Sequence, residues 1–89
     1  MVKEGWLKKL GNVNKKWKKR WFTLNKYQQL KYYEDNKRMK FLGIIDCKLI
    51  LSVTNGKIYG NDMKYTMELN TKQRVWIIAA KDENDRVNV

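Results

Sequence analysis

Short apolar runs alternate with polar turns along the whole chain. The runs are rich in β-branched and aromatic residues, which favour strands: GWLKKL (5–10), WKKRWFTL (17–24), LKYY (30–33), FLGIIDCKLILSV (41–53), KYTMEL (64–69) and RVWIIAA (74–80). Turn sequences with Gly, Asn and Asp separate them: 11–16, 25–29, 34–38, 54–57 and 60–62. This pattern predicts a mainly β fold of six or seven strands, joined mostly as hairpins. A sequence typical of a helix start appears only at KDENDR (81–86).

The alternation of faces along a strand predicts which side chains of the first three strands point together. In an antiparallel meander, four apolar residues lie deep on one face: Leu7, Phe22, Leu24 and Leu30. Four polar residues lie at the rim of the same face: Lys9, Lys18, Arg20 and Tyr32. One face is therefore apolar at depth and cationic at its rim. Because like charges repel, this arrangement favours a multiply charged anion at the rim.

The residue types at the rim suit a phosphorylated small headgroup. Lys supplies mobile ammonium donors, Arg a fork that fits phosphate, and Tyr a hydroxyl. Lys15 and Lys16, in the loop between the first two strands, add charge beside backbone N–H groups that can also cradle phosphate. The alternative interpretation of these lysines is that they form a solvated face, or that their charge protects a strand edge from aggregation. It stays open above all for Lys8, Lys15, Lys16 and Lys19, taken one at a time. For Tyr32 the alternative is packing as a core residue beside Leu30.

Composition narrows the classes of function. The 89 residues predict a single domain, 1–89, and a formal charge of +11 favours anionic partners: nucleic acid, an anionic membrane or an acidic protein. An enzyme is the class least expected, because the chain has no His, one Cys and one Ser, and no cluster has metal-ligand spacing. We therefore expect neither catalytic residues, nor a metal, nor a cofactor.

The location of the chain is predicted from two further features. Cys47 has no partner for an internal disulfide, and the first residues, MVKEGW, do not resemble a signal peptide. Both indicate a reducing, cytoplasmic location. Runs such as WIIAA are far too short to cross a bilayer, which needs about 18 or more apolar residues. Any membrane contact is therefore expected to be peripheral.

Five segments follow one another along the chain: EGWLKKLG, KKWKKRWFTL, LKYY, GIID and RVWIIAA. Together they resemble a pleckstrin homology (PH) domain over nearly the whole chain. The pattern GWLxKxGxxxKxWKxRWFxL, as it stands here, is highly specific to that family. The resemblance implies a bent antiparallel barrel of two near-orthogonal sheets, about seven strands in all, closed by a C-terminal helix. It also implies a non-enzymatic module that brings its parent protein to phosphoinositides at the plasma membrane.

The resemblance extends to members that recognise 3-phosphorylated inositides, PI(3,4,5)P3 or PI(3,4)P2. Those members have a Lys near the end of the first strand, a basic-x-Arg pair in the second and a Tyr in the third. These positions match Lys9, Lys18, Arg20 and Tyr32, and loop positions such as Lys15 and Lys16 often add phosphate contacts. Family members often have a basic residue just before the glycine of the fourth strand. Leu42 stands there in this chain, which weakens the expectation of selectivity for a trisphosphate.

The C-terminal capping helix of the family has only Arg86–Val89 left to form it after KDEND, and is expected to be truncated or absent. An open barrel end would expose apolar surface, so a homo-oligomer through that end is a further expectation. Nucleic-acid binding is disfavoured, because the RNA-recognition strand signature is missing and the predicted rim is compact. The main alternative is a protein-interaction scaffold with nonspecific attraction to anionic lipid.

Overall fold

The computed structural model describes residues 3–13, 15–55 and 65–80. These form seven strands and a short 3-10 helix: β1 (Lys3–Leu10), β2 (Trp17–Leu24), β3 (Gln29–Tyr33), β4 (Phe41–Asp46), η1 (Cys47–Leu49), β5 (Ser52–Asn55), β6 (Tyr65–Asn70) and β7 (Val75–Ala80). The prediction of a mainly β fold with about seven strands is confirmed. The expected C-terminal helix, and with it the open end that suggested a homo-oligomer, concern residues 81–89, which lie outside the described residues.

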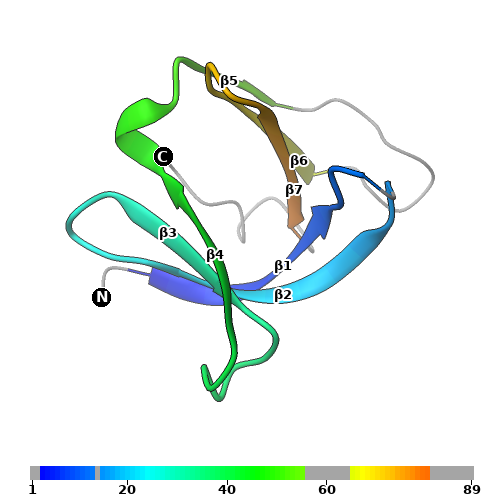
Figure 1. Cartoon of the computed structure of the whole chain (residues 1–89), viewed down its shortest axis with the longest axis vertical. Coiled ribbons are helices and arrows are strands. Elements are labelled where there is room, and N and C mark those ends of the chain that lie inside the picture. Colours follow the sequence, from blue (N-terminus) through cyan, green and yellow to red (C-terminus); the bar gives the residue numbers. More distant parts are fainter. Residues whose placement is uncertain (1–2, 14, 56–64, 81–89) are drawn as a thin grey trace.

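All seven strands belong to one antiparallel sheet in the order β4-β3-β2-β1-β7-β6-β5. Strand β1 joins the two halves of this sheet. It pairs with β2 along its whole length, but with β7 only through Lys8↔Ala79 and Lys9↔Ile78. Figure 1 shows the sheet bending at this junction, so that β5 to β7 run across the direction of β2 to β4. The two crossed layers implied by the resemblance are therefore the two halves of one continuous sheet.

The bend encloses a core to which every strand except β5 contributes a buried side chain. The members are Leu7, Phe22, Leu30, Tyr32, Ile45, Met67, Leu69 and Ile78. Three of the four residues predicted to lie deep are buried, and Leu24 is half-buried against the same core. The alternation of faces in β1, β2 and β3 thus determines which residues pack inside.

The mostly apolar run 41–53 divides into β4, η1 and β5, and the break falls at the charged residues Asp46 and Lys48. The Asp46 carboxylate accepts a hydrogen bond from the backbone N–H of Lys48 at 3.1 Å, which caps η1. The strand-forming run 41–53 predicts that Cys47 is a half-buried strand residue. It is half-buried, but it lies in this 3-10 turn, so its assignment to a strand is wrong. The turn lets the chain pass from β4 at one edge of the sheet to β5 at the other.

Candidate functional site

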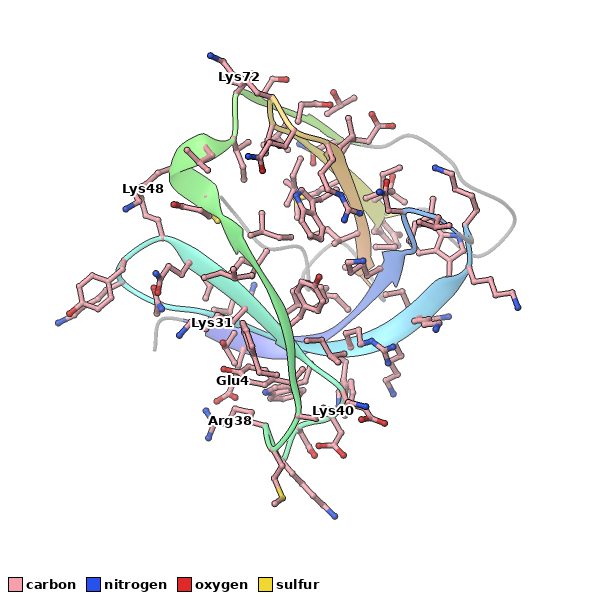
Figure 2. The ribbon with its side chains drawn as sticks, in the orientation of Figure 1. Glu4, Lys31, Arg38, Lys40, Lys48 and Lys72 are labelled. Carbon is pink, nitrogen blue, oxygen red and sulfur yellow. The ribbon has the colours of Figure 1, made fainter. Side chains whose placement is uncertain are left out.

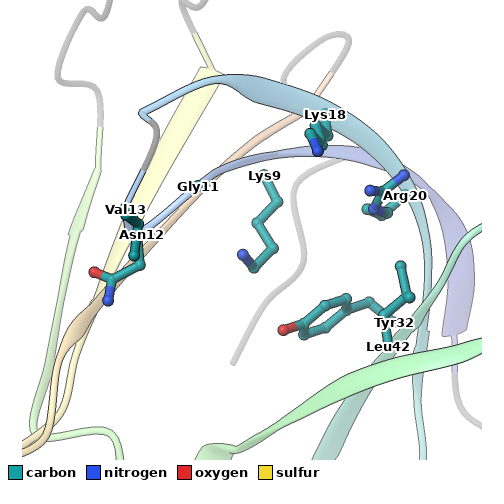
Figure 3. A pocket seen from close by; sticks show the side chains of 8 residues that line it. All are labelled: Lys9, Gly11, Asn12, Val13, Lys18, Arg20, Tyr32 and Leu42. Carbon is teal, nitrogen blue, oxygen red and sulfur yellow. The ribbon is translucent and has the colours of Figure 1, made fainter.

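A cavity opens between the β1–β2 hairpin and strands β3 and β4. Its volume is about 340 Å³, which lies within the range of small-ligand sites. Its lining residues are Lys9, Gly11, Asn12, Val13, Lys18, Arg20, Tyr32 and Leu42. The structure therefore brings together all four rim residues predicted from strand alternation, and Figure 3 shows their side chains directed into one space.

Lys9 lies at the centre of this group of cations. Its Nζ is 5.3 Å from the centroid of the Tyr32 ring and 5.2 Å from that of the Trp76 ring. Burial lowers the pKa of Lys9, and the positive charges of Arg74, Arg20 and Lys18 lower it further. A bound anion would offset this repulsion, because an opposite charge nearby stabilises the protonated amine.

Tyr32 forms the wall of the cavity opposite Lys9. Its ring packs on Phe22 at 5.4 Å and on Trp76 at 6.0 Å between centroids. Burial raises the pKa of Tyr32, although the charges of Arg74 and Arg20 act in the opposite direction. The hydroxyl therefore stays protonated near neutral pH and can donate a hydrogen bond to an anion.

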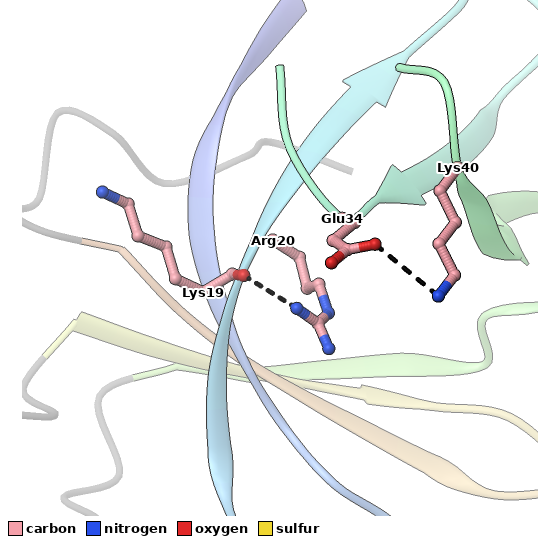
Figure 4. Close-up of polar contacts among 4 residues, drawn as sticks. All are labelled: Lys19, Arg20, Glu34 and Lys40. Atoms are coloured by element: carbon pink, nitrogen blue, oxygen red, sulfur yellow. Dashed lines mark hydrogen bonds and ion pairs between the residues drawn. The ribbon is translucent and has the colours of Figure 1, made fainter. Parts of the chain in front are cut away.

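Arg20 and its neighbour Lys19 lie on opposite faces of β2, as alternation requires. Arg20 lines the cavity, and its Nη1 donates to the Lys19 carbonyl oxygen at 3.3 Å (Figure 4). The Lys19 ammonium lies instead over the outer Trp6 ring, 4.6 Å from its centroid. Lys8 pairs with Lys19 across the two strands and shares that outer face. The alternative interpretation of Lys8 and Lys19 as a solvated face fits this placement.

The loop lysines stand apart from the cavity. Lys15 and Lys16 are exposed and are not among its lining residues. Lys15 has a positive φ of 56°, and the Gly11 N–H donates to the Lys16 carbonyl at 2.9 Å to close the hairpin. Asn12 and Val13 line the cavity from this loop, and Val13 is 92% exposed. A phosphate contact from either loop lysine stays a prediction.

Arg74 is a cation beside the site that the sequence analysis missed. Its Cζ lies 3.6 Å from the centroid of the Trp76 ring, and its buried Nε has no hydrogen-bond acceptor among the described residues. The Thr71 hydroxyl donates to the Arg74 carbonyl at 2.8 Å, which holds the turn before β7 in place. Arg74 has the same parity as Trp76 and Ile78, so alternation predicts its face, but only the pairing of β7 with β1 places that face beside the site.

Two kinds of feature are absent from the described residues, 3–13, 15–55 and 65–80. No three His, Cys, Asp or Glu side chains within these ranges group closely enough to hold a metal ion. No helix within them is long and apolar enough to cross a membrane.

Comparison with protein families matches residues 1–88 to the PH domain. Among solved structures, the C-terminal PH domain of pleckstrin in complex with D-myo-Ins(1,2,3,5,6)P5 superimposes with a TM-score of 0.77 at 26% identity. The match covers 94% of this chain and 82% of that one.

Two curated relatives are much longer than this chain. A RAC family serine/threonine-protein kinase homolog of Dictyostelium discoideum is 35% identical over 86 residues, which cover 93% of this chain and 18% of the kinase homolog. A human dual adapter for phosphotyrosine and 3-phosphotyrosine and 3-phosphoinositide is 46% identical over 45 residues, 51% of this chain and 16% of the adapter.

Proposed function

This chain belongs to the PH domain family, and from that premise we propose that it is a membrane-targeting module whose cavity binds a phosphorylated inositol headgroup. PH domains are non-catalytic modules that bind phosphoinositides or proteins. The observation that carries the proposal is the convergence of Lys9, Lys18, Arg20 and the Tyr32 hydroxyl on one cavity. Three cations and a neutral donor in a half-enclosed space match the charge and hydrogen-bonding needs of clustered phosphates.

Binding has two parts in this proposal. The positive charge outside the cavity attracts the chain to an anionic leaflet, at about 1 kcal/mol for each Lys or Arg near the surface. Figure 2 shows such side chains at separate points around the molecule: Lys31, Arg38, Lys40, Lys48 and Lys72. The cavity then selects the headgroup. The attraction to the leaflet falls as salt is added, whereas the half-buried charges of Lys9 and Arg20 in the cavity are screened less.

We further propose a 3-phosphorylated headgroup, PI(3,4,5)P3 or PI(3,4)P2, and recruitment from the cytoplasm to the plasma membrane. Three features support this choice: the Lys, basic-x-Arg and Tyr pattern, the similarity to an adapter named for 3-phosphoinositide, and the similarity to a PH domain solved with an inositol pentakisphosphate. Leu42 lines the cavity with an apolar side chain where related domains often carry a cation. For that reason we expect a smaller preference for the trisphosphate over PI(3,4)P2.

The deciding experiment is a titration with liposomes that carry bis- and trisphosphorylated phosphatidylinositols of different stereochemistry at matched total charge. It is done at roughly physiological salt and again with salt raised. We expect selective binding that persists in the higher salt. Binding that follows total charge and disappears with salt would contradict the proposal. It would favour the second candidate, a protein-interaction domain with nonspecific attraction to anionic lipid.

We propose that the guanidinium of Arg74, whose Nε has no acceptor among the described residues, donates a hydrogen bond to the headgroup. Arg74→Leu is therefore expected to weaken selective binding about 10-fold or more, since a charge-assisted hydrogen bond contributes about 1.5–3 kcal/mol. The pKa of Lys9 should rise in the same variant, since the charge of Arg74 now lowers it. The matched control is Lys72→Leu, which removes the same charge from an exposed side chain in the same turn. Equal losses in the two variants, measured by the same liposome titration, would show that Arg74 acts only through net charge.

A further inference from the structure

We propose that Gly43 is a positioning residue for the cavity: its missing side chain leaves the space in which the Tyr32 ring lies. Gly43 in β4 is the direct cross-strand partner of Tyr32 in β3. A Cβ added at Gly43 would lie 2.6 Å from Cζ and 3.0 Å from Cε1 of Tyr32, and closer still to the hydroxyl oxygen. The ring therefore covers the α-carbon of Gly43, an arrangement in which an aromatic side chain compensates for a glycine on the neighbouring strand.

The Tyr32 ring has little room to move aside. Phe22 and Trp76 pack against it, the Lys9 Nζ lies over it, and only 9% of the residue is exposed. A methyl group at position 43 must therefore displace the ring or shift β4 away from β3. Real Cβ atoms hardly ever approach another heavy atom within 3.0 Å, so the structure cannot absorb the contact unchanged.

A β-bulge beside Gly43 couples this contact to the shape of the cavity. Tyr32 pairs with Gly43 and Tyr33 with Phe41, so Leu42 is the extra residue of β4. Bulges next to functional sites re-aim side chains, and here Leu42 lines the cavity while Gly43 does not. Gly43 thus acts on the headgroup through Tyr32, and through the Lys9 ammonium that lies over the Tyr32 ring.

This inference rests on the proposed function for its binding readout. We expect Gly43→Ala to reduce selective, salt-resistant phosphoinositide binding about 10-fold or more, the effect of misplacing a hydrogen bond to a charged group. Low-salt attraction to phosphatidylserine vesicles should stay within about 2-fold, because no charge is lost. The matched control is Gly5→Ala in β1, where an added Cβ meets nothing within 4 Å. Gly5→Ala should keep both kinds of binding.

A double-variant cycle separates positioning from a general effect on the fold. In a Tyr32→Leu background the ring is gone, so Gly43→Ala should change the remaining binding by less than about 2-fold. The proposal would be overturned if Gly43→Ala reduced binding as much in the Tyr32→Leu background as in the wild type. It would also be overturned if Gly43→Ala, like Gly5→Ala, kept selective binding.

Thermal unfolding of the same four proteins of the cycle supplies a second readout that does not depend on any ligand. Gly43→Ala should lower Tm in the wild type and much less in the Tyr32→Leu background. If Gly43→Ala fails to fold, the double variant should still fold, and an equally unfolded double variant would refute the inference. If the wild type shows no selective binding, the proposed function fails. The Tm coupling then still decides whether Gly43 positions Tyr32.

Discussion

Replacing Arg20 with alanine is expected to abolish selective phosphoinositide binding, with a loss of affinity of about 100-fold or more. Arg20 lines the cavity beside Lys18 and Lys9, and its planar guanidinium can hold a phosphate through two parallel N–H donors. Removing one partner of a desolvated, hydrogen-bonded charge pair costs about 2–5 kcal/mol. The remaining lysines supply charge but not the rigid fork, so Arg20→Lys should recover only part of the binding.

Lys19→Ala is the matched control for the Arg20 variant. It removes the same charge from the adjacent residue, but its ammonium lies over Trp6 on the outer face of the sheet. We expect Lys19→Ala, like Lys8→Ala, to reduce only the salt-sensitive attraction to anionic vesicles. Liposome titration at two salt concentrations distinguishes the two effects. Equal losses in the Arg20 and Lys19 variants would mean that net charge, and not the cavity, determines binding.

Strand alternation was enough to predict four of the eight residues that line the cavity. Lys9, Lys18, Arg20 and Tyr32 belong to three consecutive hairpin strands, so their parity and the antiparallel direction together determine their shared face and end. The same reasoning placed Leu7, Phe22 and Leu30 in the core. These predictions needed only local periodicity and short connections, which are the strongest signals in a sequence.

The parts that were missed depend on contacts between segments far apart in the chain. Arg74 reaches the site only because β7 pairs with the end of β1, a pairing that no hairpin connects. The role of Gly43 depends on the cross-strand register and on the bulge at Leu42, and one residue of slip would place a different side chain under Tyr32. The 3-10 turn at Cys47 interrupts a mostly apolar run, and its only local signal is the charged pair Asp46 and Lys48, of which Asp46 caps the turn.

The apolar core and the cationic rim share one face because the cations of the rim lie over aromatic rings that pack against the core. The Lys9 ammonium lies over Tyr32 and Trp76, and the Arg74 guanidinium lies over Trp76. Cations held over ring faces gain attraction from the aromatic quadrupole. The aromatic residues of the site therefore pack the interior on one side and position charge on the other. Stability and binding are accordingly expected to depend on different residues of the same strand.

Phe22→Ala tests whether stability and binding depend on different residues of β2, because Phe22 lies two residues from Arg20. It is expected to have the largest effect on stability. Phe22 is 1% exposed and packs against the Tyr32 ring at 5.4 Å. Truncating a buried Phe costs about 3–5 kcal/mol, through lost burial and the cavity left behind. Native domains have only about 5–15 kcal/mol in total, and a chain of this size lies toward the low end. The variant should be largely unfolded near 37 °C, and urea unfolding followed by tryptophan fluorescence measures the loss.

Phe41→Ala is the control for this loss, because it makes the same substitution in β4 at a side chain that is 55% exposed. Phe41 contacts Tyr33 on the outer face, so its truncation should cost no more than about 1 kcal/mol. Arg20→Ala should likewise leave the urea midpoint nearly unchanged while it removes selective binding. If Phe41→Ala destabilised the fold as much as Phe22→Ala, the outer face would contribute as much to folding as the core. If Arg20→Ala unfolded the chain, its binding defect would no longer identify the headgroup site.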